Sequence, residues 1–240
     1  MTAAPPAQLW HQAASFLGFS GHQPARLLVL ASALLALIAV SSRRVWPFTR
    51  TVVTIAHEGG HALMALLTGR RLDSVRVLRS TAGVTVSSGS RTGPGIVLTT
   101  AAGYTAPPLL GLGAAALLTT GHLFSMLLFS LAGLAGLAVA VRNGYGLLAV
   151  LVTGAAIGVV LWRGTPLAEA AFGYLLTWFL LLGGVRPVLE LQRTRRRHPS
   201  GHNDADQLAA LTGLPGWLWV GVFSLVALAA LAVSALWLIG

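Results

Sequence analysis

The sequence predicts an all-α polytopic membrane protein with about seven transmembrane helices and a small β-hairpin between the second and third helices. Of its 240 residues, 55% are hydrophobic and 9% are charged, and the mean hydropathy is +0.76. Both contents lie outside the range of soluble globular domains. The apolar residues fall into long runs, and the 16 basic residues, all of them arginine, cluster in short segments between those runs. This pattern is typical of a chain that crosses a membrane several times.

The composition also limits the kinds of site and partner. The chain has no cysteine, so any metal ion must be held by histidine, aspartate, glutamate or water. Its net charge of +10 comes from arginines placed between apolar runs, which favours an oriented membrane protein and argues against a nucleic-acid partner. Arginine without lysine, with abundant alanine and glycine, is typical of a GC-rich bacterial genome. We therefore expect a multi-pass protein of the bacterial cytoplasmic membrane, embedded in the lipid bilayer.

Two regions are expected along the chain. Residues 1–25 are interpreted as an N-terminal cytoplasmic or interfacial segment, because the apolar side chains between Leu9 and Leu17 are spaced as in a short amphipathic helix. Residues 26–240 are expected to form a single transmembrane domain that includes a basic cytoplasmic loop at 186–206. The predicted spans are the apolar segments 27–40, 51–67, 94–120, 122–141, 144–162, 166–185 and 214–239.

The stretch between the second and third spans differs from them in its residue pattern. Residues 72–79 and 83–87 are rich in β-branched side chains that partly alternate with polar ones, and residues 81–83 (Thr-Ala-Gly) can turn the chain between them. We interpret this stretch as a β-hairpin over about 72–88. The alternative is a solvated loop.

The arginines predict an orientation. With seven spans, twelve of the 16 arginines fall on one side and four on the other. The positive-inside rule then places the N-terminus, the hairpin and the basic loop in the cytoplasm, and the C-terminus outside.

The motif His57-Glu58-Gly59-Gly60-His61 lies inside the second span. Residues four apart share a helix face, so the two imidazoles can hold one ion, and the carboxylate beside them can take a proton from water; this is the arrangement of zinc peptidases. The alternative is a pair of polar residues that hydrogen-bond within a bundle, but ionisable groups at membrane depth are costly and mark function. The two glycines weaken a helix by ~1 kcal/mol each, a cost that close approach of a helix or substrate offsets.

The predicted topology also limits where a third ligand can come from. His61 precedes the Arg70 boundary by nine residues, so the site would lie ~13 Å inside the cytoplasmic edge and be reached from that side. A catalytic zinc usually has three protein ligands, and the chain has six acidic residues. Those on the correct side and not otherwise assigned are Asp204 and Asp206. Their ordinary alternatives are a helix N-cap and a favourable charge in a first helical turn.

One further polar residue is a candidate for substrate binding. Asn143 follows Arg142 on the predicted cytoplasmic side and can donate a hydrogen bond to a substrate or an oxyanion. The alternative is that its side chain caps the loop.

Together these residues resemble the site-2 protease family of intramembrane zinc metalloproteases. The resemblance rests on the His-Glu-x-x-His motif within a span, the hairpin after it, the sequence Ala-Ala-Gly-Tyr-Thr-Ala-Pro-Pro at 101–108, and the segment 204–217 with its Asp-Ala, Thr-Gly-x-Pro and Trp elements. The closest resemblance is to a compact bacterial branch without PDZ or CBS domains.

The resemblance implies a zinc endopeptidase with one ion that hydrolyses a peptide bond in or near the transmembrane segment of a membrane protein. Carried over to this chain, His57 and His61 are metal ligands and Glu58 is the catalytic base. Asp204 is the preferred third ligand and Asp206 the second choice. The alternative function is a non-catalytic membrane scaffold or metal-binding regulator that keeps the protease fold.

Overall fold

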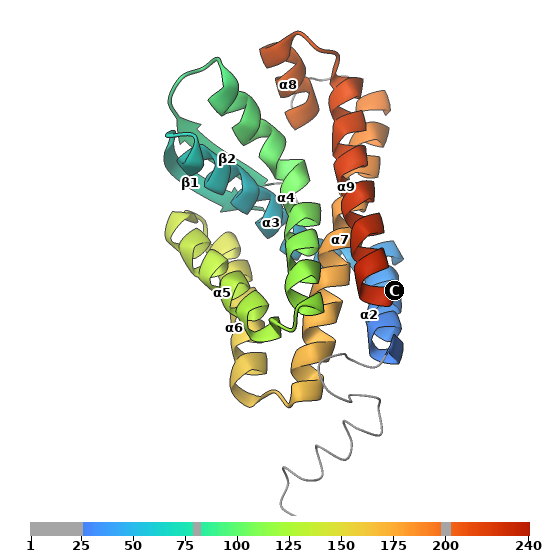
Figure 1. The fold of residues 1–240 in the computed structure, drawn as a ribbon. Coiled ribbons are helices and arrows are strands. Elements are labelled where there is room, and N and C mark those ends of the chain that lie inside the picture. Colours follow the sequence, from blue (N-terminus) through green and yellow to red (C-terminus); the bar gives the residue numbers. More distant parts are fainter. Residues whose placement is uncertain (1–25, 79–82, 198–202) are drawn as a thin grey trace, which may run out of the picture.

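The computed structural model describes residues 26–78, 83–197 and 203–240. The amphipathic segment predicted within residues 1–25 therefore lies outside the described residues, as do two residues of the predicted turn. Figure 1 shows a helical bundle with two strands and a short helix toward the same end, which we call the hairpin end. The helices are α2 (Arg26–Ser41), α3 (Trp46–Leu67), α4 (Pro94–Thr119), α5 (Leu123–Ala140), α6 (Gly144–Arg163), α7 (Pro166–Arg197), α8 (Asp204–Thr212) and α9 (Gly216–Ile239), and the strands are β1 (Arg71–Val77) and β2 (Gly83–Ser88).

The number of candidate membrane spans differs from the sequence prediction. Within the described residues, five helices are long and apolar enough to cross a membrane, namely α4, α5, α6, α7 and α9. Helices α2 and α3 pass the same test only as a pair, bent by 102°, which would make six. The 16 residues of α2 are fewer than the ~20 that a span needs, and α3 carries the polar motif. The prediction of two separate spans in this region, and so of seven in all, is not matched.

Side chains within the bend and from α7 stabilise the bend between α2 and α3. The hydroxyl of Ser42 accepts hydrogen bonds from the backbone N–H groups of Arg44 and Val45, at 3.3 and 3.2 Å, which satisfies donors at the start of α3. From α7, the guanidinium of Arg186 donates to the carbonyl of Val40 near the end of α2. The same guanidinium lies 4.6 Å from the ring centroid of Trp46, the first residue of α3. One cation thus contacts both sides of the bend.

The two strands pair in antiparallel fashion, with Val75 opposite Thr85 and Val77 opposite Gly83. The other edge of β1 is covered: Val141 forms a parallel bridge with Val75, and the Arg142 N–H donates to the Val75 carbonyl at 2.9 Å. No described segment except β1 pairs with β2. The sheet therefore presents its β2 edge unpaired in the part of the chain that the structure describes.

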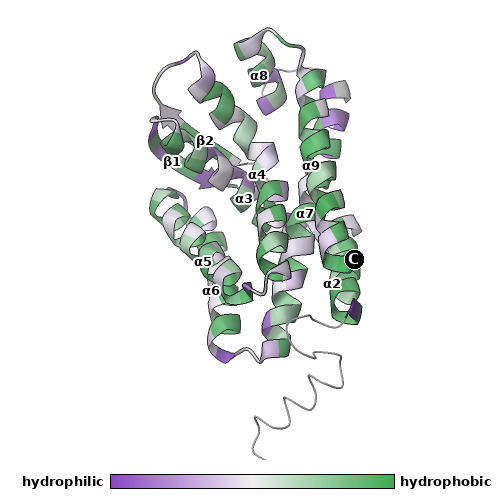
Figure 2. Cartoon of the chain, in the orientation of Figure 1, coloured by the Kyte–Doolittle hydropathy of each residue, from purple (hydrophilic) through white to green (hydrophobic). Residues whose placement is uncertain are grey.

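The helices expose apolar side chains where lipid would surround them. The largest core cluster centres on α7, which contributes Ala170, Trp178 and Leu181. On the outside, Val139 is 74% exposed and Trp162 is 75% exposed, which would be unfavourable in water. Figure 2 shows hydrophobic residues along most of α5 and α9 and hydrophilic ones in the strands and in α8. The molecule is a multi-pass membrane protein.

Candidate metal centre

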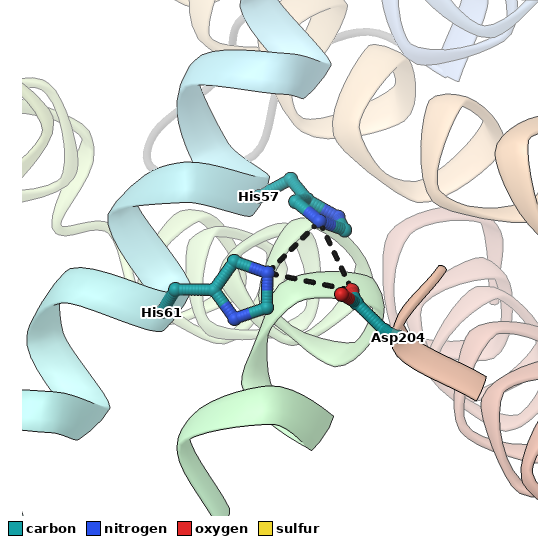
Figure 3. Close-up of side chains that lie close together, drawn as sticks. All are labelled: His57, His61 and Asp204. Atoms are coloured by element: carbon teal, nitrogen blue, oxygen red, sulfur yellow. Dashed lines mark hydrogen bonds and ion pairs between the residues drawn. The ribbon is translucent and has the colours of Figure 1, made fainter. Parts of the chain in front are cut away.

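Three side chains from two distant segments meet at the hairpin end. His57 and His61 project from one face of α3, one turn apart, and Asp204 is the first residue of α8 (Figure 3). The Nε2 atoms of the two histidines are 3.0 Å apart, and Oδ2 of Asp204 lies 3.3 Å from His57 Nε2 and 3.4 Å from His61 Nε2. One ligand atom from each residue lies within 4.8 Å of the others. The group could hold a metal ion.

The orientation of His61 is fixed from α4. Its Nδ1 lies 2.7 Å from the backbone carbonyl of Thr99. A carbonyl only accepts hydrogen bonds, so Nδ1 carries the proton and the lone pair of the neutral ring is on Nε2. That lone pair faces His57 and Asp204. A backbone partner on the far nitrogen is the usual way in which proteins orient a metal-binding histidine.

The donor set fits a tetrahedral zinc ion. Two ligands 2.0–2.1 Å from one tetrahedral ion lie ~3.3 Å apart, close to the three separations in this group. Oδ2 of Asp204 is buried and has no hydrogen-bond donor among the residues that the structure describes, so a cation would satisfy it. Burial would raise the pKa of the Asp204 carboxyl, but positive charge on the adjacent imidazoles of His57 and His61 outweighs burial and holds that pKa below its ordinary value, and a metal ion held by the same atoms would act in the same direction. The carboxylate is therefore available as an anionic ligand.

Space around the imidazoles depends on glycine. A Cβ atom on Gly103 of α4 would lie 2.6 Å from His57 Nε2 and closer still to His61 Nε2. A Cβ atom on Gly60 would lie 2.7 Å from the Ala102 carbonyl oxygen, so this glycine permits the close packing of α3 on α4 that the motif suggested. A Cβ atom on Gly59 would lie 3.9 Å from the side chain of Leu137, an ordinary contact distance.

Glu58 is held by the hairpin. It is 2% exposed, and its Oε2 accepts a hydrogen bond of 2.6 Å from the Thr85 hydroxyl in β2. Gly83 passes so close that a Cβ atom there would lie 2.5 Å from Glu58 Cγ. The strand thus fixes a buried carboxylate one residue from His57. Buried carboxylates are costly unless they are hydrogen-bonded, which Thr85 supplies.

Two other predicted residues are not part of the group. Asp206 points to α7, where Arg195 contacts its Oδ1, and its Oδ2 accepts from the amide of Asn203 at 2.6 Å. Asn143 forms two hydrogen bonds with the main chain of Val77 in β1, accepting from its N–H at 3.1 Å and donating to its carbonyl at 2.7 Å. The side chain of Asn143 therefore supports the edge of the sheet, and its predicted contact with a substrate stays a prediction.

Sequence reasoning did not identify the partners that orient the site. Thr85 and Thr99 carried no signal, because a threonine in a strand or an apolar helix has no distinctive pattern. Gly103 and Tyr104 stand within the Ala-Ala-Gly-Tyr stretch that entered the family resemblance. The Tyr104 ring packs edge-on against His57 at 4.8 Å and stacks on Phe223 of α9 at 5.0 Å. The aromatic pair forms a wall of the site.

Comparison with known proteins identifies the family of the chain. No curated protein and no solved structure matches the chain. The family model described as Peptidase M50B-like, a family of site-2 proteases, matches residues 30–234. The matched region runs from within α2 to within α9 and contains all three donors of the candidate metal group. This chain, as the His-Glu-x-x-His motif and the segment around Asp204 indicated, belongs to the Peptidase M50B-like family of intramembrane metalloproteases.

Proposed function

We propose that this protein is an intramembrane zinc endopeptidase that hydrolyses a peptide bond in or near the transmembrane segment of a membrane protein. The observation that carries the proposal is the convergence of His57, His61 and Asp204 on one point, next to the buried Glu58. The domain extends over residues 26–240.

The residues have separate roles in the proposed reaction. Zinc held by His57, His61 and Asp204 would supply a Lewis acid that polarises the scissile carbonyl and lowers the pKa of water. Glu58 accepts the proton of the attacking water and passes it to the leaving amine. The hydroxyl of Thr85 orients the Glu58 carboxylate for this transfer, since it holds Oε2 at 2.6 Å.

The hairpin suggests how a substrate is presented. A transmembrane helix hides its carbonyls in hydrogen bonds, so the substrate must be unwound before cleavage. The β1 edge is occupied by Val141 and Arg142, whereas the β2 edge is paired with no other described segment. Gly83 and Thr85 place β2 beside Glu58. An unwound substrate segment that pairs with β2 would therefore be held as a strand next to the site.

The proposed orientation follows six crossings, with α2 and α3 together as one. The segments that join crossings at the hairpin end then carry ten of the 16 arginines and the opposite end two, so we place the hairpin end in the cytoplasm. The site is reached from the cytoplasm, as the sequence predicted. An even number of crossings places the start of α2 outside, however, whereas seven spans placed it inside. The ten arginines are Arg70, Arg71, Arg76, Arg79, Arg91, Arg142, Arg193, Arg195, Arg196 and Arg197, and the two are Arg26 and Arg163.

The proposal is tested with purified protein in proteoliposomes that contain a reporter with a cleavable transmembrane segment. We expect about one zinc ion per chain, and we expect Glu58→Gln to lower the cleavage rate by about 10²- to 10⁴-fold, because general-base catalysis contributes that much. Glu169→Gln, the same change in the first turn of α7, is the control and should cleave normally. A protein without zinc, or a Glu58→Gln protein that cleaves normally, would contradict the enzyme and favour the scaffold alternative.

A further inference from the structure

The placement of Asp204 poses a geometric problem. The residue starts α8, a helix of nine residues, and its carboxylate must face α3, an element 137 positions earlier in the chain. Ala205 and Leu208 are fully buried and attach α8 to the rest of the bundle. Apolar contacts of this kind are non-directional, so these two buried side chains alone would define the rotation of a short helix about its axis only loosely. A metal ligand requires positions accurate to about 0.2 Å.

A polar latch defines that rotation. Arg195 of α7 contacts Oδ1 of Asp206 through Nε at 2.8 Å and Nη2 at 2.5 Å. The side-chain amide of Asn203 donates from Nδ2 to Oδ2 of Asp206 at 2.6 Å. Its side-chain oxygen Oδ1 accepts from the backbone N–H of Asp206 at 3.1 Å, which caps α8. Both carboxylate oxygens of Asp206 are therefore engaged. The two-point guanidinium contact is directional, unlike the apolar anchors.

The latch is enclosed where three helices meet. The side chains of Arg195 and Asp206 are only 18% and 19% exposed, so the pair is less screened than a surface ion pair. At the start of α9, a Cβ atom on Gly216 would lie 2.9 Å from both Arg195 Cζ and Asp206 Oδ1. Helix α9 thus covers the pair with a residue that has no side chain. The close fit leaves α8 little freedom to turn.

Because Asp204 and Asp206 are two residues apart on α8, fixing the side chain of Asp206 also fixes the side of the helix from which Asp204 projects. Successive residues of a helix are ~100° apart, so residues two apart point ~200° from each other. With Asp206 bound to α7 on one side of α8, Asp204 projects from nearly the opposite side, where His57 and His61 lie. We propose that Arg195, Asn203 and Asp206 are positioning residues that set the rotation of α8 and thereby place the Asp204 carboxylate in the metal site. The inference rests on the proposed function for the ligand role of Asp204.

Zinc affinity of the purified full-length protein, measured by competition with a chelator, tests the latch without relying on cleavage. Arg195→Gln and Asp206→Asn should each weaken zinc binding about 10- to 100-fold, as is typical when the support of a ligand is removed. Arg193→Gln is the matched control, because Arg193 is exposed on the same helix, and it should leave the affinity unchanged. Arg195→Lys keeps the charge and loses the two-point contact, so its affinity should fall between those of the wild type and Arg195→Gln.

A cobalt-substituted sample separates the latch from a general loss of fold. Cobalt(II) absorption reports the coordination geometry, so the latch variants should show an altered visible spectrum while α-helix content stays that of the wild type. The latch is overturned if Arg195→Gln and Asp206→Asn bind zinc as the wild type does while Asp204→Asn binds weakly. Wild-type affinity in Asp204→Asn would instead overturn the ligand assignment, and a wild type without zinc would overturn the proposed function.

Discussion

At the scale of single residues, the site depends on glycines that leave space as much as on the side chains that make contacts. Gly103 lies against both imidazoles and Gly83 against the Glu58 side chain, and neither position has room for a Cβ atom. The polar contacts are equally specific, since Thr99 fixes the ring of His61 and Thr85 fixes the carboxylate of Glu58. Small changes at these positions should therefore alter chemistry before they alter the fold.

The first prediction concerns Gly103. Gly103→Ala should abolish zinc binding and cleavage, because the added methyl group overlaps the nitrogen atoms of His57 and His61. Gly113→Ala on the same helix is the control: its added Cβ would meet no side chain of the described residues within 4 Å, so it should bind zinc normally and gain helix stability, by ~1 kcal/mol. Zinc content measured by mass spectrometry distinguishes the two. Full zinc content in Gly103→Ala would contradict the site geometry.

The second prediction concerns Thr85. Thr85→Val removes the hydroxyl but keeps the side-chain shape, so Glu58 loses its 2.6 Å hydrogen bond while remaining buried. Hydrogen bonds to charged groups are worth about 1.5–3 kcal/mol, so kcat should fall about 10- to 100-fold with zinc content and KM unchanged. Thr85→Ser restores the hydroxyl and should recover most of the rate. A Thr85→Val enzyme with normal kcat would show that the hydroxyl does not orient the base.

The sequence was sufficient for the residues that share one helix. His57 and His61 are four positions apart on α3, so helical periodicity alone places them on one face. The choice between Asp204 and Asp206 could not be made in this way, because it depends on the rotation of α8, which Arg195 determines across a helix–helix contact. Thr85 and Thr99 meet their partners 27 and 38 residues away. Such contacts leave no local pattern.

At the scale of elements, the pair α2 and α3 departs most from the sequence prediction. The apolar segments 27–40 and 51–67 predicted two spans, because hydropathy records composition and not direction. The direction is decided by Arg186, which contacts Val40 and Trp46 on the two sides of the bend and pairs with Glu190 at 2.9 Å. The contacts of Arg186 with Val40 and Trp46 join residues far apart in the sequence, so hydropathy does not reveal them. By contrast, α5, α6 and α9 stand where apolar runs of full span length predicted helices.

The third prediction tests that contact. Arg186→Gln should destabilise the protein by roughly 2 kcal/mol, because Val40 and Glu190 both lose a charged partner. For a chain of this size the thermal midpoint should fall by about 5 °C. Arg163→Gln is a matched control, since Arg163 also lies over a tryptophan, Trp162, but at the exposed end of α6, and its midpoint should not change. Equal midpoints for the two variants would mean that Arg186 does not stabilise the bend.

At the scale of the whole molecule, the proposed orientation depends on the arginine distribution and on the number of crossings. With α2 and α3 as one broken crossing, the start of α2 and the connection between α6 and α7 lie on the same side. Figure 1 shows both of them away from the hairpin end. Seven spans would separate them across the membrane. The two interpretations therefore differ in the side on which Arg26 lies.

The fourth prediction uses the absence of cysteine from the sequence, so that an introduced cysteine is the single thiol of this protein that a maleimide can label. In intact cells, a membrane-impermeant maleimide should label Arg26→Cys and Thr165→Cys but not Thr92→Cys, which should react only after permeabilisation. Thr165 and Thr92 have the same location in both interpretations and serve as controls. Labelling of Arg26→Cys only after permeabilisation would restore seven crossings.

The origin of the three donor atoms in distant parts of the chain has a consequence for biosynthesis. His57 and His61 enter the membrane early, while Asp204 is made 143 residues after His61. A chain whose synthesis has not reached Asp204 therefore has two of the three metal ligands, and under the proposed function it cannot cut the membrane proteins around it. Once α8 docks, a bound ion would tie together segments that enclose most of the chain, and closing so long a loop restricts the unfolded state. Completion of synthesis and the onset of activity would then coincide.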